Sequence, residues 1–456
     1  MTATPCLSLP VLVGAMLGAS EQGVTNMQTG RRSGRGWVAG VAALLWLALA
    51  LPLSAATVKE VADTYANIAQ AGYEDSVVRA KALKAAIDRM IDAPTADNLA
   101  TARAAWIAAR VPYMQTEAYR FGNKIVDDWE GRVNAWPLDE GLIDYVDPSY
   151  GTASDSNPLY AANVIANRTL TVSGRKADAS KITKELLADT LQEAERIEAN
   201  VATGYHAVEF LLWGQDLNGT ERGAGNRPVT DFDTKKCTGG NCDRRIAYLR
   251  VVTDLLIEDL EEMAANWGPD GEARKALFAP ETDPLTMIFT GLGSLSYGEL
   301  AGERMKLGLL LNDPEEEHDC FSDNTHNSHY YNVIGMENVY FGRYTRIDGS
   351  EVKGASVSDL VRAKSAEIDD RVRQALAETN KRMTALKTRA EKVEAYDQML
   401  GEGNKEGNAV IESAIEALIA QTKELERAVD VLELRAITFE GSDSLDNPGK
   451  ALEGKK

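Results

Sequence analysis

A histidine and a glutamate three residues apart, His206 and Glu209, are the residues whose types and spacing could do chemistry. They lie in the stretch GYHAVEFLLWG, residues 204–214, and the whole chain has only four histidines. Residues three apart share one face of an α-helix, so an imidazole nitrogen and a carboxylate could both bind one metal ion. The same spacing occurs in many helices where the pair is solvated or packed in a core, so spacing alone leaves both interpretations open.

The other three histidines form a second candidate group, because His318, His326 and His329 fall within twelve residues. Asp, Asn and Cys residues surround them, among them Cys320. A hydrogen-bonding network and metal ligation both explain such clustering of the rarest ionisable residue. The pattern therefore predicts that these histidines bind a ligand or shape its site.

A third stretch, 285–312, is predicted to be a helix that is unusually rich in glycine, alanine and serine. Glycines lower helix stability, so their abundance favours close approach of another backbone or of a ligand. Glu299 and Glu303 share a face of this helix, and Arg304 follows them. We interpret these three residues as candidates for the same site.

Helical periodicity dominates the elements that must position these residues. A short helix is expected from Thr203 to Gly214, with others over 159–170, 178–202 and 242–266, and no succession of strands is expected. Another helix should be kinked or restarted at Pro112 and continue to Phe121. The sequence predicts an all-α protein of two packed helical, four-helix-bundle-like domains after a cleaved signal peptide.

The predicted domain organisation begins with an N-terminal signal peptide, residues 1–56, in which arginines precede an apolar run and small residues. Residues 1–26 are untypical of a signal, so Met27 is an alternative start. An N-terminal bundle, 57–225, is predicted to contain the histidine–glutamate motif. A C-terminal bundle, 226–437, should contain the histidine-rich stretch, and a frayed polar tail, 438–456, should follow it. A mature chain without a transmembrane segment, in the periplasm, is expected.

The charge of the chain and its cysteines restrict the ligands and cofactors that we expect. With 49 basic and 69 acidic residues the net charge is −20, which disfavours nucleic acid. The charge either attracts cations or serves solubility alone. In an oxidising compartment Cys237 and Cys242 can form a disulfide, leaving Cys320 over. The chain has no Cys-x-x-Cys-His motif for covalently attached haem.

Three separated motifs resemble the imelysin-like family. Residues 204–210 resemble its Gly-x-His-x-x-Glu signature, and residues 109–121, which include Glu117, also resemble the family. Residues 315–326 are similar to the branch called iron-regulated protein A. The resemblance covers roughly 60–437.

The resemblance implies two helical bundles with the signature near their interface, a periplasmic or outer-membrane-associated location, and a role in iron acquisition beside other iron-uptake proteins of the cell envelope. The metal ligands expected are His206 and Glu209, joined by Glu117 and Glu299. Iron is the expected metal on the strength of the family, because mixed imidazole and carboxylate ligands suit zinc equally.

Two alternatives to iron binding stay open at this point. A metallopeptidase would use Glu209 as its catalytic base, but the His-Glu-x-x-His motif is absent and Ala207 follows His206 where that motif has its base. A helical ligand- or partner-binding protein without metal is the other alternative.

Overall fold

The computed structural model describes residues 56–435 and 437–453, and the expected signal peptide lies outside the described residues apart from Ala56. Within the unit 54–456 the chain is mainly helical, as predicted. No helix of the described residues is long and apolar enough to cross a membrane. The helices are α1 (Val58–Asp92), α2 (Ala96–Met114), α3 (Lys124–Glu130), α4 (Glu140–Ile143), α5 (Gly204–Trp213), α6 (Cys242–Asn266), α7 (Glu272–Leu277), α8 (Pro284–Ser294), α9 (Leu307–Leu311), α10 (Thr325–Phe341), α11 (Val357–Lys364), α12 (Ala366–Lys392), α13 (Tyr396–Leu400), α14 (Lys405–Val431), α15 (Asp443–Asp446) and α16 (Pro448–Glu453).

Segments of other helical types connect these elements. Two have π-helical hydrogen bonding, η3 (Leu186–Leu191) and η6 (Leu295–Lys306), and η6 joins α8 to α9. The remaining ones are single 3-10 turns: η1 (Glu117–Tyr119), η2 (Pro148–Tyr150), η4 (Ala194–Arg196), η5 (Val229–Phe232), η7 (Pro314–Glu316) and η8 (Cys320–Ser322).

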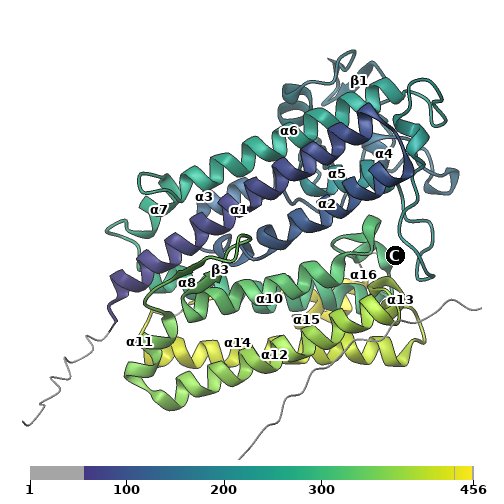
Figure 1. The fold of residues 1–456 in the computed structure, drawn as a ribbon. Helices are drawn as coiled ribbons and strands as arrows, with labels where there is room; N and C mark the ends of the chain where they lie inside the picture. Colours follow the sequence, from purple (N-terminus) through teal and green to yellow (C-terminus); the bar gives the residue numbers. More distant parts are fainter. Residues whose placement is uncertain (1–55, 436, 454–456) are drawn as a thin grey trace, which may run out of the picture. The chain divides into compact units, whose positions relative to one another are not determined.

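The long helices pack in two groups (Figure 1). Helices α1, α2 and α6 lie side by side with α5 against α6, while α10, α12, α14 and η6 pack on one another, and α2 contacts α10. Apolar side chains such as Leu83, Trp106, Leu256 and Leu418 are fully buried between them. The division into bundles at residue 225 stays a prediction, and α6, which follows that boundary, packs against α1 and α5, which precede it.

The expected helices over 159–170 and 178–202 are wrong. Residues 169–178 form an antiparallel hairpin of β1 (Thr169–Val172) and β2 (Arg175–Asp178), and only the short turns η3 and η4 follow. Ser173 and Gly174 both have positive φ, which is the geometry of a tight two-residue hairpin turn. The Ser-Gly pair was the available signal, since β-branched residues precede it.

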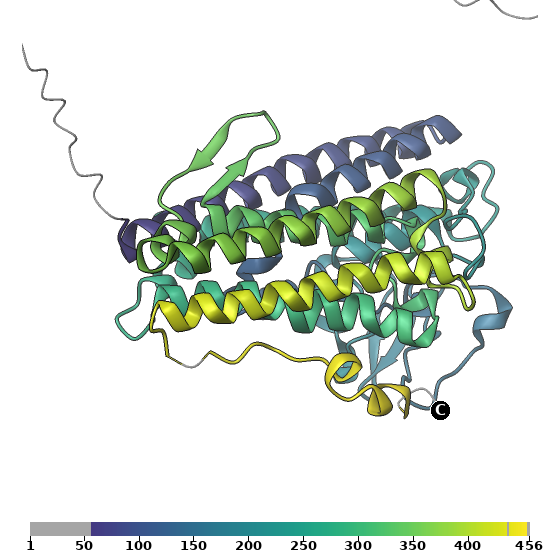
Figure 2. The ribbon, with the colours of Figure 1, turned by 90° about the horizontal axis from the view of Figure 1, so that it is seen from below.

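A second hairpin, β3 (Arg343–Thr345) with β4 (Glu351–Lys353), extends beside α1 (Figure 2). The expected continuation of the second helix to Phe121 is also wrong, because α2 includes Pro112 but ends at Met114. The chain then turns through η1, which places Glu117 in the core, 2% exposed.

The C-terminal segment is packed where fraying was expected. Its residues run along α8 and η6 (Figure 2), and the Glu440 carbonyl lies 2.4 Å from where a Cβ on Gly298 would stand. The backbone N–H of Glu440 also donates to Ser294 Oγ, at 3.0 Å. Close approach of another backbone, one of the two reasons expected for the small residues of 285–312, is therefore confirmed.

Candidate functional site

The helix that carries His206, α5, begins and ends where the sequence predicts, with Thr203 before it and Gly214 after it. Gly204 has φ +80°, and a Cβ there would stand 2.4 Å from the Val133 carbonyl oxygen. The same carbonyl accepts a 2.7 Å hydrogen bond from the backbone N–H of Tyr205. Only glycine lets the backbone of residue 204 come this close to the Val133 carbonyl, and the contact fixes the start of α5 beside Val133.

His206 and Glu209 are both buried and in contact. His206 Nδ1 lies 3.0 Å from Glu209 Oε2, while Glu209 Oε1 accepts hydrogen bonds from the Ser322 backbone N–H (3.0 Å) and Oγ (2.6 Å). His206 Nε2 has no partner among the described residues. The carboxylate thus contacts one ring nitrogen and leaves the other available to a ligand, the arrangement typical of metal-binding histidines.

Burial decides the protonation of this pair. It lowers the pKa of His206 to about 3, helped by the positive charge of Arg110, so the imidazole is neutral at physiological pH. Burial, with the charge of Asp319, raises the pKa of Glu209. A positive ion beside His206 would act against this rise and favour the ionised carboxylate.

His318 and Asp319 come from a distant segment and complete the cluster. The rings of His206 and His318 meet edge to face with centroids 4.8 Å apart. One potential ligand atom from each of His206, His318 and Asp319 lies within 4.8 Å of the others, and all three residues are buried. Burial also lowers the pKa of His318, so its imidazole too is neutral.

Arg110 is the charged partner of this cluster. Its Nη2 donates to Asp319 Oδ1 at 2.8 Å and lies 3.2 Å from His318 Nδ1. Although burial acts to raise it, the guanidinium holds the pKa of Asp319 well below its usual range. Asn324 (2.8 Å) and Ser328 also donate to Asp319, so this carboxylate is firmly positioned.

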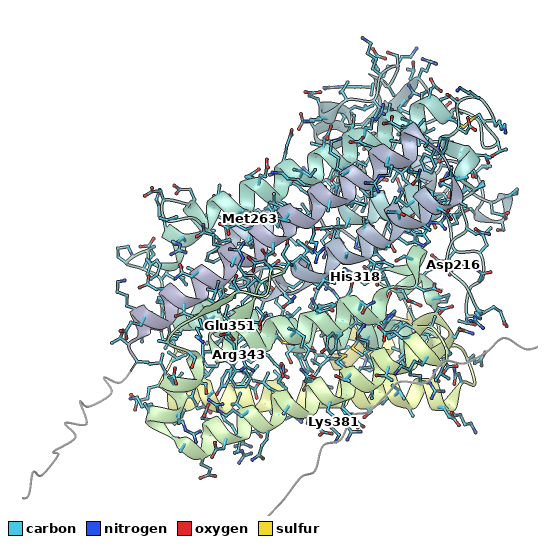
Figure 3. All side chains as sticks on the ribbon, viewed as in Figure 1. Asp216, Met263, His318, Arg343, Glu351 and Lys381 are labelled. Carbon is cyan, nitrogen blue, oxygen red and sulfur yellow. A yellow bond between two sulfur atoms is a disulfide. The ribbon has the colours of Figure 1, made fainter. Side chains whose placement is uncertain are left out.

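A cleft of about 940 Å³ reaches this cluster at His318. Figure 3 labels His318 between the group containing α1 and the group containing α10. Two arginines, Arg120 and Arg304, and eight carboxylates line the cleft: Asp127, Asp128, Glu130, Glu193, Glu198, Glu299, Glu303 and Glu316. This excess of negative charge raises the local concentration of cations in front of His318.

Glu117 and Glu299, expected as ligands, lie at a neighbouring arginine. Arg304 donates to Glu117 Oε2 at 2.6 Å and to Glu299 Oε1 at 2.8 Å, and its Nη1 donates to Asn332 Oδ1 at 3.0 Å. Neither glutamate belongs to the group of His206, and ligation by them stays a prediction. Glu303 is exposed and borders the cleft.

His326 and His329 lie on the first turns of α10 and do not belong to the group of His206, His318 and Asp319. His326 Nε2 is 3.1 Å from Asn327 Nδ2. His329 stacks edge to face on Tyr396, with centroids 5.2 Å apart, and neither of its nitrogens has a partner among the described residues. Burial lowers the pKa of His326 to about 4 and of His329 to about 3.

The expected disulfide between Cys237 and Cys242 is present, with Cα atoms 5.9 Å apart, and Cys320 is a free thiol. Sequence reasoning missed the roles of Arg110, Asn134 and Ser322. Asn134 accepts from Arg110 at 2.6 Å and donates to Glu130 at 3.0 Å, which links the cluster to the cleft. The available signal was the presence of Arg110 and Ser322 inside the family-like motifs.

Comparison with known proteins agrees with these motifs. The imelysin family model matches residues 69–425. Iron-regulated protein A of Synechococcus elongatus (strain ATCC 33912 / PCC 7942 / FACHB-805) is 38% identical over 71 residues, which are 15% of this chain. That matched stretch covers only 20% of the relative's length.

Two solved structures share the fold. One, assigned as an iron-regulated protein A precursor from Parabacteroides distasonis ATCC 8503, superposes with a TM-score of 0.57 at 18% identity, over 84% of this chain and 97% of its own. The other, an imelysin-like protein from Psychrobacter arcticum 273-4, has a TM-score of 0.53 at 15% identity, over 83% and 98%. With the family model matching most of its length, the chain belongs to the imelysin family.

Proposed function

We propose that this protein binds one iron ion as cargo at the cluster of His206, His318 and Asp319, and serves iron acquisition in the periplasm. The observation that carries the proposal is the buried, unpartnered Nε2 of His206 beside a second neutral imidazole. A buried nitrogen without a partner costs free energy, and a metal ion would satisfy it.

The chemistry of the donor set fits iron. Two neutral imidazoles and one carboxylate, with further positions open, form the set that ferrous sites in proteins use, and zinc is the alternative that the same atoms accept. The iron-regulated names of the relatives favour iron. Glu209 then acts as a positioning residue, because its contact with Nδ1 directs Nε2 of His206 toward the ion.

Arg110 opposes the incoming ion. Its guanidinium already neutralises Asp319 at 2.8 Å, so the metal must compete with it for that carboxylate. The competition makes binding reversible, which suits a protein that releases its cargo. The acidic cleft supplies the opposite effect by attracting cations toward His318.

Equilibrium dialysis of the purified mature chain tests the proposal. Ferrous iron, ferric iron, zinc and manganese are each measured against wild type and His206→Ala. One iron per chain in wild type, lost in the variant, is expected. Iron bound equally by both proteins contradicts the proposal.

A metallopeptidase is the second candidate, favoured by the size of the cleft and by Glu130, a buried carboxylate on its wall. Burial raises the pKa of Glu130, as a general acid or base requires. Chelator-sensitive peptide cleavage that is lost in Glu130→Gln would promote this candidate over transport.

A further inference from the structure

A second group of carboxylates lies where three segments meet. Asp216 follows α5, Asp323 precedes α10, and Asp397 lies on α13. One oxygen from each lies within 4.8 Å of the others. Figure 3 labels Asp216 toward the end of the structure where α13 lies in Figure 1.

Two buried carboxylates lie together here, Asp397 of the group and Glu317, which lines the same cavity. Asp397 is 2% exposed and Glu317 is 1% exposed, and neither oxygen of either residue has a partner among the described residues. Both residues and Asp216 line one small cavity of about 10 Å³. Thr325 and the backbone of Gln398 act on Glu317 and Asp397 only as weak donors that lower their pKa values. Buried carboxylates are normally paired or metal-bound, so these oxygens are suited to contact a cation.

The charges around the group are negative. The strongest charge acting on both Glu317 and Asp323 is that of Asp397, and Asp216 adds to it. Asp216 and Glu394 in turn act on Asp397. Burial and this repulsion raise the pKa of Asp323 to about 8 and of Asp397 to about 7. Among the described residues, the charges that act most strongly on Glu317, Asp323 and Asp397 are all negative.

The dimensions and the ligand type select the cation. One oxygen from each of the three aspartates lies within 4.8 Å of the others, so a single calcium ion with oxygen distances of roughly 2.3–2.6 Å could contact all three. A set made only of carboxylate oxygens suits hard cations such as calcium. It lacks the imidazole ligands of the proposed iron site. The cavity has room for about one ion or water molecule.

We propose that Asp216, Glu317, Asp323 and Asp397 form a calcium site that joins the loop after α5, the segment before α10 and α13. Asp323 directly follows Ser322, whose backbone and hydroxyl donate to Glu209. Calcium therefore fixes the segment that positions the His206 cluster. The two groups share no ligand, so each site can be removed by a substitution that leaves the ligands of the other in place.

Calcium binding and thermal unfolding of the purified mature chain test the site, after calcium is removed with a chelator. Wild type, Asp397→Asn and the control Glu402→Gln are compared, since Glu402 is an exposed carboxylate near Asp397 outside the group. We expect one calcium per chain and a higher Tm with calcium in wild type and control. Asp397→Asn should bind calcium at least about tenfold more weakly and should unfold at a higher Tm than wild type in chelator, because repulsion is relieved.

The His206→Ala variant separates this proposal from the iron proposal. Its calcium affinity should equal that of wild type whether or not iron binding is lost. The proposal is overturned if wild type binds no calcium at millimolar concentration, if Asp397→Asn binds it as wild type does, or if the group takes iron in preference to calcium.

Discussion

His206 Nδ1 lies 3.0 Å from Glu209 Oε2, and Glu209 is held in turn by two hydrogen bonds from Ser322. In the proposed function this relationship makes Glu209 a positioning residue and assigns Nε2 of His206 to the ion. It also ties the motif on α5 to a segment more than a hundred residues away, which carries His318 and Asp319.

Glu209→Gln keeps the size of the side chain and removes its charge. Iron affinity should fall about 10- to 100-fold, because the imidazole loses the carboxylate that orients it and strengthens its donor atom. Equilibrium dialysis against ferrous iron measures the change, with Glu402→Gln as the control for loss of one carboxylate. An affinity equal to that of wild type would show that the contact does not position His206.

Arg110→Gln removes the buried cation that pairs with Asp319. The free energy of unfolding should fall by about 3–5 kcal/mol, because one buried charge is left uncompensated. Iron should then raise the Tm of this variant more than that of wild type, since the ion replaces the missing charge. Arg382→Gln, which breaks an exposed pair with Glu378, should cost no more than about 1 kcal/mol. Equal losses in urea unfolding would contradict the role of Arg110.

The pH dependence of stability should report the buried His329, whose pKa is lowered to about 3 by burial and by Arg304. The unfolded chain takes up a proton at this residue near pH 6.5 and the folded chain does not, so stability is lost as pH falls below 6.5. Relative to His329→Gln, wild type should lose about 1.4 kcal/mol per pH unit between pH 6 and pH 4. Urea unfolding at three pH values measures this, and parallel curves for the two proteins would rule it out.

Gly298→Ala tests the packing of the C-terminal segment. The new methyl group would meet the Glu440 carbonyl at 2.4 Å, so the segment must shift, and a loss of about 1–3 kcal/mol is expected. Gly449 provides the control Gly449→Ala, because a methyl group added there would meet nothing within 4 Å. Thermal unfolding compares them, and a neutral Gly298→Ala would mean that the segment does not dock there.

Local signals account for the parts of the structure that the sequence predicted. Gly204 and Gly214 enclose an apolar run, so the bounds of α5 could be placed, and the apolar spacing of 242–266 gave α6. The hairpin 169–178 was missed because β2 consists mainly of charged, exposed residues, which are equally typical of an exposed helix. The Ser173-Gly174 pair, both with positive φ, forms the tight turn that makes this segment a hairpin.

The candidate site was predictable only in part, because it depends on which distant segments meet. His206 and Glu209 are local, and their spacing predicted that they share one face of α5, where they are in contact. No periodicity indicates that His318 would meet them, or that Glu117 and Glu299 would be engaged by Arg304. Those contacts follow from the packing of η1, η6 and the segment before α10 around buried charges.

The iron content of His318→Ala tests the central claim most directly, because it asks whether two distant segments hold one ion. Wild type, His206→Ala, His318→Ala and the control His326→Ala, a histidine of the same stretch outside the cluster, are loaded with ferrous iron, dialysed and analysed for metal. We predict one iron per chain in wild type and in His326→Ala, and loss of iron in both other variants. Iron retained by His318→Ala at the wild-type level would contradict the account.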